Sequence, residues 1–127
     1  MKIILVDAVG AFVSNEGIVF KEMYNLLESF PNKKIILTGA NDEKFKKFGL
    51  DKMPYEVFTL EHNPKKTDPK YYEKMLEYFN LSKNDVVYFE HNLEAVKSAQ
   101  SVGIKTYYYD ANKKDLGALK DFLRENL

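Results

Sequence analysis

The sequence contains no cysteine among its 127 residues. Disulfide bonds, thiolate catalysis and cysteine-ligated zinc are therefore excluded. Neither sign of charge is in excess, because 19 basic residues balance 19 acidic ones, and we expect no nucleic-acid partner since such surfaces are normally basic. No apolar run approaches the roughly 18 residues of a membrane span. The short apolar run at the N-terminus is interrupted by Asp7, which argues against a signal peptide. We expect a cytoplasmic protein that does not associate with membranes.

The chain also lacks any linker, repeat or low-complexity stretch, so we expect one domain over residues 1–127. Short apolar runs alternate with helical patterns along its whole length. Strands are expected at 3–6, 35–38, 55–60, 86–89 and 105–110, and helices at 19–30, 41–48, from 68 onward, from 93 toward 103, and around 116–123. This alternation predicts an α/β fold, with one doubly wound parallel sheet of about five strands covered on both faces. The tyrosines at 107–109 favour an aromatic edge strand.

Polar residues stand where the predicted strands end. Asp7 closes the first run, Thr38 and Gly39 close the second, and Glu90, His91 and Asn92 follow the fourth, while Lys66 precedes a helix that Asp68 and Pro69 begin. The carboxyl ends of parallel strands form the ligand crevice of such folds, and a carboxylate there is costly to desolvate. These residues are candidates for a site. Each also has a plain structural interpretation, as a solvated strand-end acid, a turn cap or a surface lysine.

The order of Asp7, Thr38, Lys66 and then Glu90 with its neighbours at 91–92, each at a strand end or helix start, resembles the haloacid dehalogenase-like (HAD) hydrolase superfamily over roughly residues 1–110. The resemblance implies a Rossmann-like core with strand order 5-4-1-2-3 and Asp7 on the central strand. Cap domains of this superfamily often follow the first or second strand. Both connections are short here, so we expect a core without a cap.

The resemblance also implies roles for the candidate residues. Asp7 would be the nucleophile that forms a covalent aspartyl intermediate. Thr38, with Gly39 beside it, would bind the transferred group, and Lys66 would neutralise charge between nucleophile and substrate. Asn92 would contact the substrate, as in the 2-haloacid dehalogenases.

The sequence departs from the superfamily pattern at two places. The first motif usually reads Asp-x-Asp-Gly-Thr, but here Val9 stands at the second aspartate and cannot move a proton. Its backbone carbonyl remains a candidate metal ligand, together with Asp7, Glu90 and His91. The resemblance implies Mg²⁺, which prefers oxygen ligands. A histidine beside a carboxylate suits Mn²⁺ or Zn²⁺ better, but we expect these ions less, because the chain has only two histidines.

Three functional interpretations follow. The first is a weak or divergent HAD-type hydrolase, with phosphatase chemistry on a phosphorylated substrate. The second is a catalytically silent module that binds an anion or a protein partner. The third is a metal-free hydrolase similar to the dehalogenases. Assembly into a homo-oligomer is compatible with all three.

Overall fold

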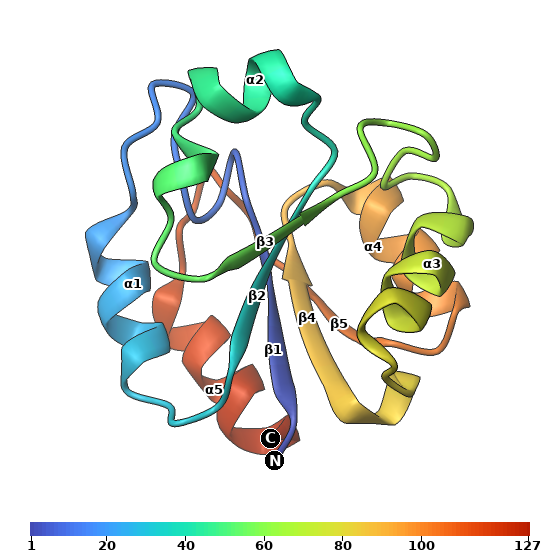
Figure 1. Cartoon of the computed structure of the whole chain (residues 1–127). Helices are drawn as coiled ribbons and strands as arrows, with labels where there is room; N and C mark the ends of the chain where they lie inside the picture. Colours follow the sequence, from blue (N-terminus) through green and yellow to red (C-terminus); the bar gives the residue numbers. More distant parts are fainter.

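A five-stranded parallel sheet forms the centre of the structure, a computed structural model that describes residues 1–127 (Figure 1). The strands are β1 (Ile3–Asp7), β2 (Lys34–Thr38), β3 (Glu56–Thr59), β4 (Val86–Glu90) and β5 (Lys105–Tyr108). Their order in the sheet is β3-β2-β1-β4-β5, and each neighbouring pair runs parallel. The predicted α/β class and strand order are confirmed, with β1 in the centre and the tyrosine-rich β5 at one edge.

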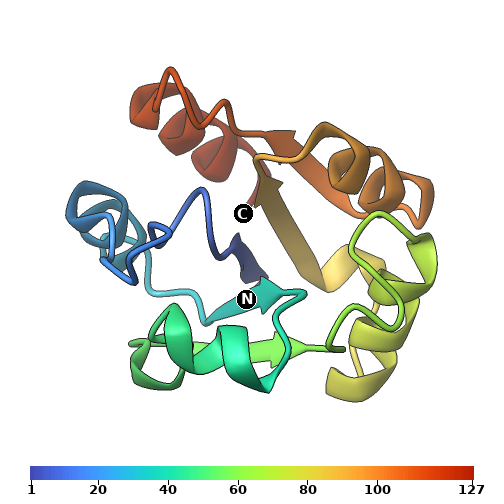
Figure 2. The same ribbon diagram turned by 90° about the horizontal axis from the view of Figure 1, so that it is seen from above.

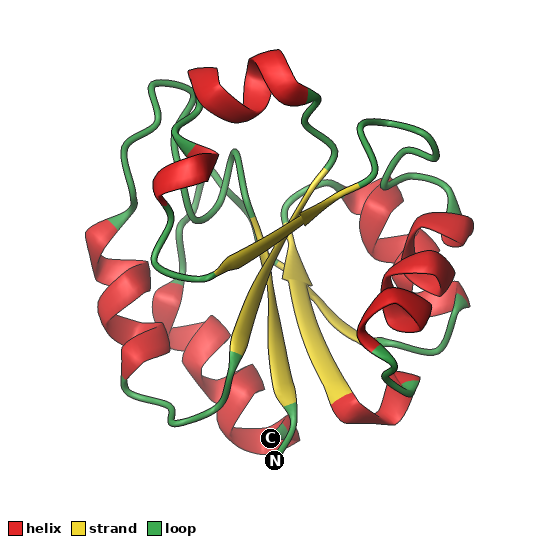
Figure 3. Cartoon of the chain, viewed as in Figure 1, coloured by secondary structure: helices red, strands yellow, loops and turns green.

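Five α-helices connect or follow these strands (Figure 3). They are α1 (Lys21–Glu28), α2 (Asp42–Lys47), α3 (Pro69–Phe79), α4 (Leu93–Ser101) and α5 (Leu116–Asn126), and two 3-10 turns, η1 (Leu50–Lys52) and η2 (Lys83–Asp85), precede β3 and β4. The predicted start of the first helix was wrong by two residues. Val19 instead bridges to Val13, and the Phe20 amide donates to the Phe12 carbonyl. Those interactions hold the segment extended, so α1 begins at Lys21.

The helices form a layer on each side of the sheet (Figure 2). Side chains of a strand point alternately to its two faces, and β1 follows this rule. Ile4 and Val6 belong to the apolar cluster under α1 and α5, whereas Leu5 belongs to the cluster under α3 and α4. All three are fully buried, as expected for the central strand of a parallel sheet.

The same alternation directs Asp7 and Glu90 toward the layer of α3 and α4, because each lies two residues beyond a member of that cluster, Leu5 and Tyr88. Both acids stand at the carboxyl ends of neighbouring strands. The connection after β1 holds α1, and the connection after β2 holds only α2 and η1, so no cap domain is evident. No helix combines the length and hydropathy that a membrane span requires.

Candidate active site

A cavity of about 330 Å³ opens at the carboxyl ends of β1, β2 and β4. Its lining comes from five segments far apart in the sequence: 7–9, 38–40, residues 44 and 48 of the α2 region, the loop residues 62 and 65–67, and 90–92 with 95. Every site residue predicted from the sequence lies in this lining: Asp7, Val9, Thr38, Gly39, Lys66, Glu90, His91 and Asn92. The structure therefore brings all the candidates together, while the role of each stays a prediction.

Lys66 lies between the two carboxylates at the floor of the cavity. Its Nζ is 2.8 Å from Asp7 Oδ1 and 2.6 Å from Glu90 Oε1, and it also donates to the Leu37 carbonyl at 3.1 Å. Asp7 and Glu90 are each only 1% exposed. One cation thus offsets part of the repulsion between two buried anions, an arrangement that would be unfavourable if the cation were removed.

His91 contacts the same two acids from the other side. Its backbone N–H donates to Asp7 Oδ2 at 3.0 Å, and its ring Nδ1 makes a short contact with that oxygen. Nδ1 is also 3.3 Å from Glu90 Oε2. The ring packs beside Gly10, where φ is +98° and an added Cβ would come within 2.6 Å of ring atoms. A glycine at position 10 therefore makes room for the imidazole.

The pKa values of these groups reflect their burial and pairing. Burial and the neighbouring Glu90 raise the pKa of Asp7. Burial also acts to raise the pKa of Glu90, but Lys66 and the contact with His91 hold it well below its usual range. Burial alone would lower the pKa of Lys66, yet the two carboxylates raise it well above its ordinary value. Contacts with Asp7 and Glu90 raise the pKa of His91 to about 10. The pairing with Lys66 therefore favours the ionised form of Glu90, whereas burial makes Asp7 harder to ionise than an exposed aspartate.

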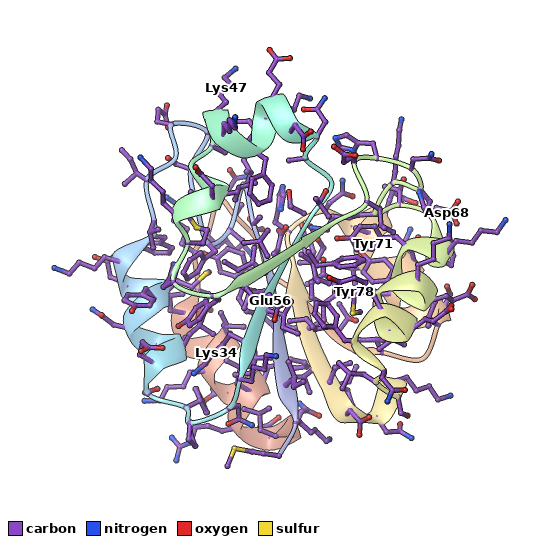
Figure 4. The ribbon with its side chains drawn as sticks, viewed as in Figure 1. Lys34, Lys47, Glu56, Asp68, Tyr71 and Tyr78 are labelled. Atoms are coloured by element: carbon purple, nitrogen blue, oxygen red, sulfur yellow. The ribbon has the colours of Figure 1, made fainter.

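The remaining candidates lie at the walls of the cavity. The Thr38 hydroxyl accepts a hydrogen bond from the Ala40 amide at 3.2 Å, and the Thr38 carbonyl accepts one from the Tyr71 hydroxyl at 2.7 Å. Tyr71 points from α3 toward the sheet (Figure 4). Asn92 lines the cavity, but its Oδ1 already accepts from the amides of residues 94 and 95 and caps α4. Its predicted contact with substrate would have to come from the amide NH₂.

Sequence reasoning missed three basic residues of the cavity, Lys44, His62 and Lys65. His62 and the preceding Glu61 both have positive φ, +63° and +54°, which costs energy for residues other than glycine and is often found at functional sites. This loop places the His62 ring over Gly39, where an added Cβ would approach it to 2.8 Å. Lys65 could have been predicted as a site residue because it adjoins Lys66. His62 and Lys44 could not, because neither stands directly at the end of a predicted strand.

Aromatic hydroxyls beneath the site were missed as well. The Tyr88 hydroxyl donates to Glu90 Oε1. Tyr71 and Tyr72 are fully buried, and the Tyr72 ring packs 5.7 Å from that of Tyr88. Their spacing on α3 indicated only an apolar face. A tyrosine on such a face carries a polar group whose partner the sequence does not reveal.

Asp7, Glu90 and His91 each offer a ligand atom within 4.8 Å of the other two. The donors are nevertheless engaged. Lys66 occupies one oxygen of each carboxylate, and the remaining two oxygens face His91 Nδ1. Mg²⁺ prefers oxygen ligands in octahedral geometry and binds carboxylates that are free to coordinate. The residues as arranged do not fit that ion.

The sequence profile of the haloacid dehalogenase-like hydrolases matches residues 19–109, well over half of the chain. The chain belongs to this family. The matched segment contains Thr38, Lys66 and the residues at 90–92, but it begins after Asp7. The role of Asp7 in the site therefore stays a prediction. No curated protein sequence matches the chain.

Solved structures of HAD proteins share this fold. A HAD family enzyme from Bacteroides thetaiotaomicron, an aspartate-to-alanine variant in complex with magnesium and inorganic phosphate, superimposes with a TM-score of 0.74 at 14% identity, over 94% of this chain and 98% of its own. A proposed β-phosphoglucomutase from Thermotoga maritima gives 0.64 at 15% identity over 100% of both chains. A dehalogenase in an intermediate complex gives 0.57 at 22% identity, over 70% of this chain and 42% of its own. At these identities the likeness concerns the fold.

Proposed function

We propose that this domain hydrolyses phosphate esters by attack of the Asp7 carboxylate on phosphorus. The observation that carries the proposal is the pairing of buried Asp7 with Lys66, 2.8 Å apart, at the floor of an open cavity. Lys66 would offset the repulsion between Asp7 and the incoming phosphate. As the Asp7 oxygen bonds to phosphorus, the ester P–O bond breaks and the leaving oxygen takes a proton from water. A second water then releases inorganic phosphate and restores the carboxylate.

We expect this hydrolysis to be slow. Val9 lines the cavity where an acid would protonate the leaving oxygen, and a valine cannot supply a proton. General acid catalysis is typically worth about 10²- to 10⁴-fold. Esters of good leaving groups, such as aryl phosphates, depend least on that acid. Activity should therefore appear first on an aryl phosphate and fall steeply on alkyl phosphates.

The charges of the cavity support an anionic substrate. Its lining contains two acidic residues against three lysines and two histidines. Both acids are already paired with Lys66, whereas neither Lys44 nor Lys65 forms an ion pair. Burial and these two lysines also lower the pKa of His62, as expected where basic groups gather without an acid. A phosphate at the rim would relieve that repulsion, and the phosphate complex of the Bacteroides neighbour agrees with this ligand class.

The test compares the wild type with Asp7→Asn on para-nitrophenyl phosphate. We expect slow release of phosphate by the wild type and none above background by the variant, because an amide is a poor nucleophile. Asp121→Asn makes the same chemical change on the exposed face of α5 and should retain wild-type turnover. Equal activity in the wild type and Asp7→Asn would contradict the role of Asp7.

One observation favours a second candidate, a catalytically silent anion-binding module. Both oxygens of Asp7 are held, Oδ1 by Lys66 and Oδ2 by His91. A carboxylate fixed by two donors is a weaker nucleophile than a free one. Binding of inorganic phosphate without turnover of any aryl phosphate, measured by calorimetry and by the same assay, would favour the module. Formation of a stable beryllofluoride adduct on Asp7 would favour the hydrolase.

A further inference from the structure

His91 Nδ1 lies between the carboxyl groups of Asp7 and Glu90. It makes a short contact with Asp7 Oδ2 and is 3.3 Å from Glu90 Oε2. Each of these oxygens also accepts a backbone amide, Asp7 Oδ2 from His91 and Glu90 Oε2 from Asn92, so each faces the ring nitrogen as an acceptor. A nitrogen that faces two acceptors must carry a hydrogen to be stable there. Its lone pair is then not available for coordination to a metal.

The remaining hydrogen bonds leave no oxygen of either carboxylate unengaged. Asp7 Oδ1 and Glu90 Oε1 both accept from Lys66, and Glu90 Oε1 also accepts from the Tyr88 hydroxyl. Asp7 Oδ2 accepts from the His91 amide, and Glu90 Oε2 accepts from the Asn92 amide at 2.9 Å. A metal ion entering this group would have to displace donors from both acids and would lose their hydrogen bonds.

The imidazole is also held in place by its surroundings. Gly10 lies against the ring, and a Cβ at that position would come within 2.6 Å of Cε1 and Nε2. The backbone N–H of residue 91 is fixed on the same Asp7 oxygen that Nδ1 contacts. The side chain retains 35% exposure, so its outer edge still faces the cavity. The ring is thus oriented from two sides and does not swing freely into solvent.

From these contacts we infer that the His91 ring takes the place of a divalent cation between Asp7 and Glu90, so that the site is metal-independent. Lys66 and the Nδ1–H of His91 then engage the two carboxyl groups without any metal. The inference goes beyond the proposed hydrolysis and does not depend on it, because it concerns which ions the site binds, with or without turnover.

The wild-type test uses the ring nitrogens of the two histidines as NMR probes. We expect the His91 nitrogens to show a protonated Nδ1 and to remain unchanged when millimolar Mg²⁺ is added. Substoichiometric Mn²⁺ should broaden neither His91 nor His62, which lines the same cavity and is a second reporter of any ion bound there. Broadening of either histidine by Mn²⁺, or a deprotonated Nδ1 that shifts on adding Zn²⁺, would overturn the inference and show that the wild-type site binds metal.

The complementary test introduces a free carboxylate at the same position. His91→Asp removes the ring and its N–H, so Mn²⁺ or Mg²⁺ should now bind with millimolar or tighter affinity by calorimetry, and Mn²⁺ should broaden His62. A folded His91→Asp protein that binds neither ion would show that the ring does not occupy a metal position. If this variant is unfolded, wild-type calorimetry decides: detectable Mg²⁺ binding overturns the inference, and none supports it.

Discussion

Lys66 illustrates how one side chain determines the state of its neighbours. A lysine between Asp7 and Glu90 places a positive charge against two carboxyl groups that are each 1% exposed. The pairing does not make the site a source of stability, since desolvating three charges offsets much of their attraction. Removing one partner is strongly destabilising, because the remaining charges stay buried without compensation.

Lys66→Met should therefore destabilise the protein by about 3–5 kcal/mol at neutral pH. Without the cation the pKa values of Asp7 and Glu90 rise in the folded state. Groups with raised folded pKa values stabilise the protein below those values and lose that contribution as the pH rises. The deficit relative to the wild type should shrink at mildly acidic pH. Denaturant unfolding at both pH values measures it, with Lys65→Met, exposed at the adjacent position, as control.

A deficit that is equal for Lys65→Met and Lys66→Met, or one that grows at acidic pH, would contradict this account of the charges.

Individual site residues could be predicted from the sequence where they directly follow or end a predicted strand. Asp7, Thr38 and Glu90 each end a strand, and parallel strands bring their ends to one edge. His62 could not be predicted in this way, because a loop with two left-handed residues carries it to the cavity. The hydroxyl of Tyr88 was hidden within a buried apolar run, and its partner Glu90 is known only from the packing.

At the scale of elements, helical periodicity and capping residues predicted the positions of most helices correctly. Asn41 accepts from the Lys44 amide and Asp68 from the Lys70 amide, so both predicted starts are confirmed. The start of α1 was wrong because helical spacing alone cannot reveal that Val19 pairs with Val13. Tertiary pairing overrides a periodic pattern most easily at the end of an element, where few intrahelical bonds are lost.

The start of α3 links an element to the site, because Lys66 lies two residues before its cap (Figure 4 labels Asp68). Asp68→Ala should destabilise the protein by about 0.5–2 kcal/mol, since the Lys70 amide loses its acceptor. Asp68→Ser keeps an acceptor and should recover most of the loss. Thermal unfolding of the three proteins measures both effects. Equal losses for Ala and Ser would mean that the hydrogen bond at this cap contributes nothing.

Two glycines near helix ends should respond in opposite directions to the same substitution. Gly117 is the second residue of α5, and an added Cβ would meet only Asp115 Oδ1 at 3.4 Å. Gly117→Ala should stabilise by about 0.4–1 kcal/mol, because alanine restricts the unfolded chain. Gly103 follows α4 with φ +96°, and a Cβ there would approach the Lys83 side chain to 2.6 Å. Gly103→Ala should destabilise by a larger amount, and denaturant midpoints compare the pair.

For the whole molecule, the alternation of strands and helices was enough to predict a doubly wound sheet. The strand order was predicted from the resemblance to the HAD superfamily. Both are confirmed. The volume and charge of the cavity were not predictable, because they arise where five segments meet. The open site follows from the short connections after β1 and β2. A substrate there would contact mainly the core itself, which gives the basic rim residues a larger share in recognition than they would have under a cap.

Restoring the two residues that depart from the superfamily pattern would show whether the scaffold as a whole can support phosphatase chemistry. The double variant Val9→Asp with His91→Asp supplies an acid for the leaving oxygen and an oxygen ligand in place of the imidazole. Val9 is half-buried in the loop after β1 and His91 is half-buried after β4, both in the cavity lining. Substitutions at such positions should cost little stability if the cavity holds water.

If the frame of Asp7, Thr38 and Lys66 is intact, the double variant should bind Mg²⁺ and hydrolyse aryl phosphates faster than the wild type. On alkyl phosphates the gain should be larger, up to the roughly 10²- to 10⁴-fold that general acid catalysis supplies. Val9→Asp alone is the control, and it should help alkyl esters without creating a requirement for Mg²⁺. The measurement is phosphate release with each ester, with and without a chelator. A folded double variant that binds no Mg²⁺ and gains nothing on either ester would mean that the cavity has been reshaped around His91, in favour of the anion-binding module.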